Sequence, residues 1–220
     1  MTINNKKIRS IAFIYLFLGI IIFALAYISI IQKQYLYDFN KPILDWFLSV
    51  RQPIISSMAK LLTNLASATS LTLITIIITL MMIFYKKEFL RPLLLLGTMT
   101  TAVLVSTLMK VIIMNSRPLQ QNMVPSYQLD YSFPSGHTLG IWIFLLTIGY
   151  LFYSRKFSFK KYICWNLFAV LLTSIIAITR LYLGYHWLTD IVASVGLGLI
   201  IFSAMIFMDK FITSSLNTDQ

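Results

Sequence analysis

Charged residues are scarce in this sequence. Only 11% of its 220 residues are Asp, Glu, Lys or Arg, whereas a soluble domain carries roughly a quarter. Hydrophobic residues make up 58% of the chain, and the mean hydropathy is +0.80. This shortage of charge excludes an ordinary soluble protein, and it indicates that lipid surrounds most of the chain.

Cysteine and acidic residues are also few. The single cysteine, Cys164, excludes a disulfide within the chain, and because it lies in an apolar run we expect a buried, inert thiol. Lys and Arg number 18 against 7 Asp and Glu, which gives a formal net charge of +11. The basic residues lie mostly at the ends of apolar runs, and no stripe of basic and aromatic residues is present. We therefore expect membrane lipids, and no nucleic acid, as partners of this charge.

Long apolar runs are what the sequence does contain. A membrane-spanning helix needs about 20 largely apolar residues, and six runs approach or reach that length. They are Ile11–Ile31, Leu71–Tyr85, Leu93–Met114, Leu139–Tyr153, Tyr162–Thr179 and Trp187–Met208. The runs are continuous rather than alternating, so no strands of a membrane barrel are indicated. We predict an all-α, integral membrane, six-helix transmembrane bundle that forms a single domain over residues 1–220.

The basic residues also predict the orientation of the bundle. Ala24-Leu25-Ala26 has the form of a signal-peptide cleavage site, but the apolar run continues to Ile31, so we expect an uncleaved anchor. Six spans place both termini on one side. With that side inside, 11 of the 18 basic residues fall in inner segments, namely Lys6, Lys7, Arg9, Lys86, Lys87, Arg91, Arg155, Lys156, Lys160, Lys161 and Lys210. The positive-inside rule then predicts cytoplasmic termini in the cell membrane.

A shorter segment, Pro53 to Ala66, is amphipathic. Its apolar residues follow the spacing of one helical face, and they are Ile54, Ile55, Met58, Leu61, Leu62 and Leu65. One interpretation is an extracytoplasmic helix lying on the membrane surface, with Trp46 nearby as an interface anchor. The other is a helix that packs over the bundle, and the sequence does not separate the two.

Residues suited to catalysis gather at the outer ends of the predicted spans. They are Lys110, Arg117, Ser135, Gly136, His137, Arg180, His186 and Asp190. The only two histidines of the chain belong to this set. Each residue alone has an ordinary explanation, such as a snorkelling lysine, a headgroup contact or a helix cap. Their joint occurrence at one membrane face indicates a site.

The cations of this set indicate phosphate binding. Arginine offers planar, bidentate hydrogen bonds, and lysine offers a compact point charge. Lys110, Arg117 and Arg180 would therefore clamp one phosphoryl group without a metal. Ser135 and Gly136 precede the fourth span, where free backbone N–H groups and the helix dipole favour an anion, and glycine permits close approach.

The two histidines and the aspartate indicate a nucleophile and an acid. If the sixth helix begins by His186, then His186 and Asp190 share one helical face. The carboxylate would hold the imidazole in one tautomer and prepare its other nitrogen as a nucleophile. His137 would then protonate the leaving oxygen.

The order and spacing of these residues resemble the type-2 phosphatidic acid phosphatase superfamily. Its motif K-x6-R-P matches Lys110 to Pro118, and its motif P-S-G-H matches Pro134 to His137. Its third motif, S-R-x5-H-x3-D, is matched with Thr179 in place of serine. The resemblance implies a six-helix bundle, a phosphohistidine intermediate and no metal or other cofactor. It also implies roles: His186 as nucleophile, Asp190 as its partner, His137 as general acid, and Lys110, Arg117, Ser135, Gly136 and Arg180 as phosphate ligands.

We therefore predict a metal-independent lipid phosphatase with an extracytoplasmic active site. Family members act on undecaprenyl pyrophosphate or on phosphatidylglycerophosphate, and the motifs do not separate these substrates. A lipid phosphotransferase of the same fold is a close alternative. A transporter would place its ionisable residues near the bilayer midplane, and a non-enzymatic scaffold would be expected to lose motif residues. A metal site built from His137, His186 and Asp190 is disfavoured because the nearby cations would repel a divalent ion.

Overall fold

The computed structural model describes residues 5–125, 129–153 and 159–218, and the regular elements in these ranges are all helical. The long helices are α1 (Asn5–Gln32), α4 (Ala68–Lys86), α5 (Leu90–Ile113), α6 (Gly136–Tyr153), α7 (Phe159–Tyr182) and α8 (Leu188–Thr218). The short ones are η1 (Tyr35–Phe39), α2 (Asn40–Ser49), α3 (Pro53–Leu65) and η2 (Gln120–Asn122). Two basic residues assigned to an inner segment, Arg155 and Lys156, lie outside the described residues.

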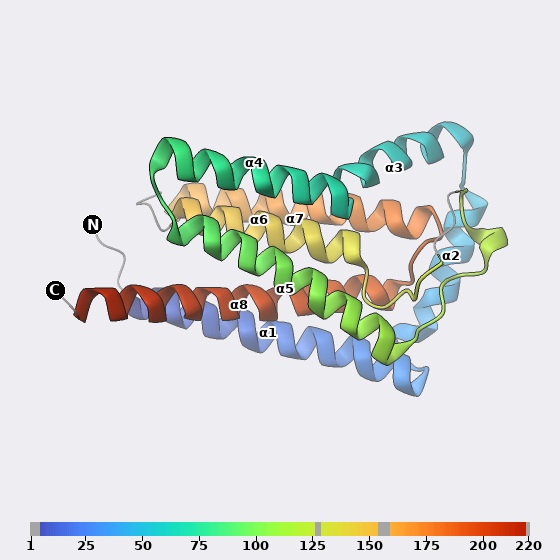
Figure 1. The fold of residues 1–220 in the computed structure, drawn as a ribbon. Helices are drawn as coiled ribbons and strands as arrows, with labels where there is room; N and C mark the ends of the chain where they lie inside the picture. Colours follow the sequence, from blue (N-terminus) through green and yellow to red (C-terminus); the bar gives the residue numbers. More distant parts are fainter. Residues whose placement is uncertain (1–4, 126–128, 154–158, 219–220) are drawn as a thin grey trace.

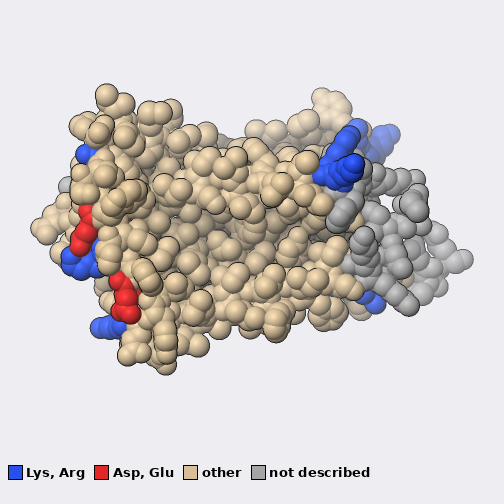
Figure 2. Space-filling view, turned by 180° about the vertical axis from the view of Figure 1, so that it is seen from behind, with Lys and Arg blue, Asp and Glu red and all other residues tan. Residues whose placement is uncertain are grey.

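Six helical stretches are long and apolar enough to cross a membrane, which confirms the predicted number of spans. They are Ile8–Gln32, Pro53–Lys86, Leu90–Ile113, Gly136–Tyr153, Lys160–Tyr182 and Leu188–Ser214. In the view of Figure 2, Lys and Arg lie at both ends of the molecule, Asp and Glu lie at one end, and the broad belt between the ends carries no charge. The chain is therefore a multi-pass membrane protein.

The bundle is arranged around α6, which packs against α4, α5, α7 and α8. In the apolar window of this helix 78% of residues are buried, against 17% in that of α1. Helix α1 lies along α8 at the side of the bundle (Figure 1). Glycine allows this close contact, because a Cβ on Gly196 would lie only 2.5 Å from the backbone nitrogen of Phe23.

Helix α3 confirms the predicted amphipathic helix, and it packs against α7. Its inward face carries Ser56, Ala59 and Thr63, whereas the large apolar side chains on the other face, such as Ile54 and Leu61, are exposed. The packing interpretation is therefore right for the small residues. The apolar face remains free to contact lipid, and its place at the membrane surface stays a prediction.

The expectation for Cys164 was wrong. Its side chain is exposed on α7, although it lies in an apolar run. An apolar run predicts a span, but lipid solvates apolar side chains as well as the protein interior does. The run therefore does not reveal which of its residues face inward.

Candidate active site

The predicted site residues come together where the C-terminal ends of α5 and α7 meet the N-terminal ends of α6 and α8, at the end of the bundle away from both termini (Figure 1). Two features build the loops there. Met114 ends α5 in the left-handed conformation, with φ of 50°, and turns the chain back across the bundle. Between α7 and α8, Gly184 has φ of +74°, and a Cβ there would lie 2.3 Å from the carbonyl oxygen of Asn122.

A half-buried arginine fixes the loop between α7 and α8. Arg51, between α2 and α3, donates to the carbonyl oxygens of Asn122 and Tyr182 over 2.8 and 2.6 Å. Asn40 holds the other side of the loop, because its side-chain oxygen accepts a hydrogen bond from the backbone nitrogen of Thr189 over 3.1 Å. The short helix α2 and its flanking loop therefore position the start of α8.

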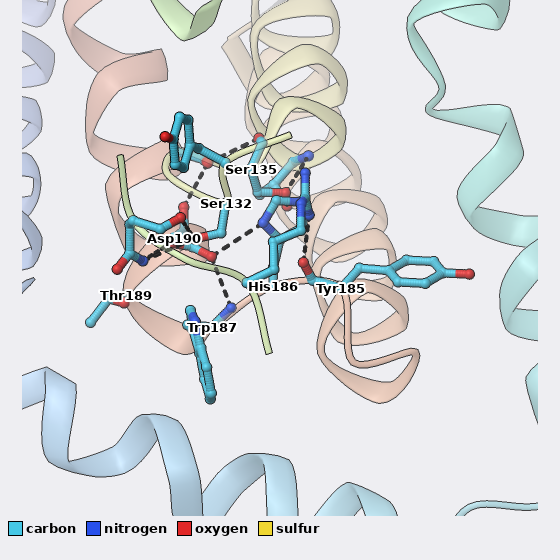
Figure 3. A network of polar contacts seen from close by, with 12 residues as sticks. Ser132, Ser135, Tyr185, His186, Trp187, Thr189 and Asp190 are labelled. Carbon is cyan, nitrogen blue, oxygen red and sulfur yellow. Dashed lines mark hydrogen bonds and ion pairs between the residues drawn. The ribbon is translucent and has the colours of Figure 1, made fainter. Parts of the chain in front are cut away.

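His186 and Asp190 form a buried pair at this loop (Figure 3). The Nδ1 atom of His186 lies 3.2 Å from Oδ2 of Asp190, and both side chains are almost fully buried. The expected reason for this contact was wrong, because α8 begins only at Leu188 and His186 precedes it. Asp190 instead reaches back from the first turn, where Oδ2 also accepts a hydrogen bond from the backbone nitrogen of Trp187 over 2.9 Å, as in a capping box.

Two residues that the motifs do not include hold the other oxygen of Asp190. Asn115 donates to Oδ1 over 3.2 Å, and the Ser132 hydroxyl lies 3.3 Å from it. The Ser132 hydroxyl also lies 3.0 Å from the carbonyl oxygen of Asn115 and accepts a hydrogen bond from the Asn115 side-chain amide over 2.9 Å. Both oxygens of the carboxylate are therefore hydrogen-bonded, so its orientation toward His186 is fixed.

The same network assigns the tautomer of His186. Nη1 of Arg117 lies 3.1 Å from Nε2 of His186 and donates to the carbonyl oxygen of Tyr185 over 2.5 Å. Since a guanidinium only donates, Nε2 accepts and carries a lone pair, and Nδ1 carries the proton that is donated to Asp190. Burial, with the nearby charges of Arg117 and Arg180, lowers the pKa of His186 well below its ordinary value of 6.5. The imidazole is thus neutral at neutral pH, as a nucleophile requires.

Lys110 and Arg117 meet at a carboxylate that the motif analysis did not identify. Nζ of Lys110 forms an ion pair with Asp130 and donates to the carbonyl oxygen of Tyr131 over 2.9 Å. Arg117 binds Asp130 twice, through Nη2 to the carboxylate over 2.7 Å and through Nε to the backbone carbonyl over 2.7 Å. Burial raises the pKa of Asp130, but the hydrogen bond from Lys110 and the two positive charges outweigh it and bring the pKa below its ordinary value.

Arg180 is the most deeply placed cation of the site. Its side chain is 2% exposed, and its guanidinium carbon lies 4.6 Å from the centre of the Tyr185 ring. Nη1 donates to the Thr63 hydroxyl of α3 over 3.3 Å. Nε and Nη2 are buried and have no hydrogen-bond partner within the part of the chain that the structure describes. Because a buried charge without partners costs several kcal/mol, these two donors point to an anion as the missing partner.

The N-terminus of helix α6 borders the same cavity as Arg180. Ser135 is fully buried, and its hydroxyl caps the helix, 3.5 Å from the Thr138 nitrogen and 3.1 Å from the Thr138 hydroxyl. The next residue, Gly136, is open to the site, since an added Cβ would meet only the Ser106 hydroxyl, 4.0 Å away. The helix terminus therefore presents its backbone without a side chain in the way.

One cavity of about 430 Å³ unites most of the predicted residues. Its polar lining includes Lys110, Arg117, Asp130, Gly136, His137, Arg180 and His186. Asp190 stands behind His186, and Ser135 serves as the helix cap, so neither of the two lines the cavity. The set predicted from sequence thus separates into residues that face the cavity and two that support them.

His137, His186 and Asp190 do not form a cluster of metal ligands in the described part of the chain. Among the described residues, no group of three or more His, Cys, Asp or Glu is placed to hold a metal ion. Both Asp190 oxygens and Nδ1 of His186 are already engaged in hydrogen bonds within the protein. The donor set around this cavity therefore suits an anion.

Sequence and structure comparisons agree on one family. Residues 91–212 match the PAP2 superfamily. A relative from Bacillus subtilis named phosphatidylglycerophosphatase B is 30% identical over 158 residues, which are 70% of this chain and 74% of the relative. The crystal structure of a transmembrane PAP2 type phosphatidylglycerolphosphate phosphatase from Bacillus subtilis matches with a TM-score of 0.79 and 25% identity, over 89% of this chain and 98% of that chain. Aquifex aeolicus LpxE shares the fold, with a TM-score of 0.56 and 19% identity over 77% of this chain and 95% of that one.

Proposed function

Because this chain belongs to the PAP2 superfamily, we propose that it is a phosphatase that hydrolyses a lipid phosphate through a phosphohistidine on His186, without a metal. The relatives named as phosphatidylglycerophosphate phosphatases favour that lipid as the first substrate to test, and undecaprenyl pyrophosphate is the second. The observation that carries the proposal is the cavity that Lys110, Arg117, Arg180 and His186 line together, because two buried donors of Arg180 have no partner among the described residues.

The shape of the cavity supports a lipid substrate. From the polar end it continues between helices, where its lining includes Leu71 and Ile76 of α4 and Leu96, Met99 and Val103 of α5. These residues belong to the second and third spans. An acyl or prenyl chain would therefore lie among apolar side chains while its phosphate reaches the cations.

The first chemical step transfers the phosphoryl group to the enzyme. Nε2 of His186 attacks phosphorus, a P–N bond forms, and the P–O bond to the lipid breaks. His137 gives its proton to the departing oxygen, and Asp190 stabilises the cationic His186 ring. The cations and the α6 N-terminus hold the phosphoryl oxygens, whose charge is largest in the transition state.

The second step returns the enzyme to its starting state. His137, now neutral, takes a proton from a water molecule that attacks phosphorus. The P–N bond breaks, and inorganic phosphate leaves with the oxygen of that water as its fourth oxygen. If a lipid hydroxyl took the place of water, the same residues would act as a phosphotransferase, so water and lipid acceptors are distinguished only by experiment.

One assay tests this function. Purified full-length protein in detergent is given both candidate lipids labelled in the phosphate, with and without EDTA, and with His186→Ala as the inactive control. We expect release of inorganic phosphate that EDTA does not reduce. Labelled lipid in place of phosphate would make the enzyme a phosphotransferase. Loss of activity with EDTA and recovery with a divalent ion would contradict the metal-free mechanism.

We further propose that the termini are cytoplasmic and that the cavity opens on the extracytoplasmic side. The support is the density of basic residues in the segments on the side of the termini. Phosphate released there would not enter the cytoplasm.

A further inference from the structure

Among the described residues, Asp130 is the one acidic side chain that lines the cavity, and neither the motifs nor the proposed mechanism uses it. Its carboxylate pairs with Lys110 and, over 2.7 Å, with Arg117. These are two of the three cations to which we assign the substrate phosphate. An oxyanion that binds both cations through the same donors therefore meets a carboxylate already bound there.

The carboxylate is not needed to keep either cation in place. Lys110 also donates to the carbonyl oxygen of Tyr131, and Arg117 also donates to the backbone carbonyls of Asp130 and Tyr185. These backbone acceptors belong to the protein main chain and remain when the side chain of residue 130 changes. The two cations would thus stay at the cavity after the carboxylate moves away.

Exposure shows which partner is free to move. The Asp130 side chain is 55% exposed, whereas the Lys110 and Arg117 side chains are 16% and 6% exposed. A carboxylate at the rim exchanges its cation contacts for water at low cost, but the cations have no such alternative. Arg180, deeper in the cavity, has no carboxylate partner among the described residues.

We infer that Asp130 is an internal competitor of the phosphoryl group, bound to Lys110 and Arg117 until substrate displaces it and returning to them when inorganic phosphate leaves. This inference rests on the proposed function. The apparent affinity for any oxyanion is then its intrinsic affinity multiplied by the fraction of molecules in which the carboxylate has left the cations. The benefit is product release, because a site with three cations and a helix N-terminus would otherwise hold inorganic phosphate tightly.

The competition has a quantitative signature. Substrate and product displace the same carboxylate, so its removal should lower KM for lipid phosphate and the inhibition constant of inorganic phosphate by the same factor. Interactions of partly exposed charge pairs and of charged hydrogen bonds suggest a factor of about ten. A residue that positions Lys110 and Arg117 would have the opposite effect, since its loss would raise both constants.

The test variant is Asp130→Asn, which keeps the size of the side chain and the backbone acceptors. The matched control is Asp45→Asn. Asp45 lies on α2 and pairs with Lys41 over 2.5 Å, with a side chain 51% exposed, and it does not line the cavity. Binding of inorganic phosphate to the detergent-solubilised full-length proteins is measured by calorimetry, and KM and phosphate inhibition are measured with the lipid substrate.

We expect about tenfold tighter phosphate binding in Asp130→Asn, an equal fall in KM, and no change in Asp45→Asn. Unchanged or weaker phosphate binding in Asp130→Asn would overturn the inference, as would an equal gain in Asp45→Asn, which would indicate a general charge effect. Calorimetry does not depend on turnover. If the wild-type protein hydrolysed no lipid phosphate, the proposed function would fail while the binding comparison would still decide the role of Asp130.

Discussion

At the scale of single residues, His137 has the role that is most easily separated from the others. It follows Gly136 at the start of α6 and lines the same cavity as His186. A lipid alcohol is a poor leaving group that needs a proton, whereas p-nitrophenyl phosphate releases a stabilised phenolate. His137→Ala should therefore lower kcat/KM, which reports the first step alone, by about 10²–10⁴-fold for lipid phosphate and far less for the activated ester. Equal losses on the two substrates would withdraw the general-acid role.

The protonation state of His186 provides a second prediction. Since burial and Arg117 lower its pKa, the folded enzyme keeps this ring neutral at pH values where an unfolded chain, with an ordinary pKa of 6.5, takes up a proton. His186 therefore destabilises the folded state progressively as pH falls below about 6.5, and it has no such effect above.

Because the chain has only two histidines, His137→Ala leaves His186 as the sole imidazole. Ring-nitrogen NMR shifts of ¹⁵N-histidine in that variant would report the titration directly. We expect a neutral ring throughout the range from pH 8 to pH 6. Half-protonation near 6.5 would show that the surroundings of His186 are more solvated than the structure indicates.

The residues in the motifs could be found from sequence because their types and spacing match the chemistry of phosphate. Asn115, Ser132 and Asp130 carried weaker signals, since polar residues in an outer loop have an ordinary explanation there. Their contacts depend on how Met114 turns the chain back and where the loop before α6 runs. Neither follows from periodicity.

At the scale of elements, α3 shows what a hydrophobic pattern decides in a membrane protein. The pattern predicted the helix, but the large apolar side chains face outward and Ser56, Ala59 and Thr63 face the bundle. In lipid, apolar side chains gain little by facing the interior, and small residues allow closer packing of helices. The same reason explains the exposed Cys164.

Thr63 connects this helix to the site, because its hydroxyl accepts a hydrogen bond from Arg180. We classify Thr63 as a positioning residue for that guanidinium. Thr63→Val should raise KM for lipid phosphate between a few-fold and about tenfold, the range for a typical intramolecular hydrogen bond. Thr63→Ser, which keeps the hydroxyl, should restore KM. If serine fails to restore it, packing of α3 against α7 would be the cause, and the hydrogen bond would not matter.

At the scale of the whole molecule, the composition predicted six spans, but it did not predict which helix lies at the centre. The central place of α6 depends on its packing against four neighbouring helices. The sequence of one apolar run does not show which other helices it packs against. The order of the spans did predict that the motif residues lie at one end of the bundle. Within the described residues, no membrane-spanning helix lies between the first motif and the second, and two such helices, α6 and α7, lie between the second and the third. Because consecutive spans cross in opposite directions, all three motifs come to one side of the bundle.

The orientation of that end in the membrane is a separate prediction. Single cysteines at Gln121 and Lys160, both in a Cys164→Ser background, would be exposed to a membrane-impermeant thiol reagent in intact cells. We expect labelling at position 121 only, with position 160 labelled after permeabilisation. Labelling of position 160 alone in intact cells would reverse the topology and place the site on the cytoplasmic side.

The central claim is that Nε2 of His186 takes the phosphoryl group, and trapping the adduct tests it most directly. Protein mixed with substrate labelled in the phosphate is quenched rapidly without acid, digested and mapped. We predict an acid-labile phosphoryl group on His186, absent from His186→Ala, and longer-lived in His137→Ala with the activated ester because the second step lacks its base. A labelled adduct that persists in His186→Ala, or turnover of the wild-type enzyme with no adduct at any time, would contradict the account.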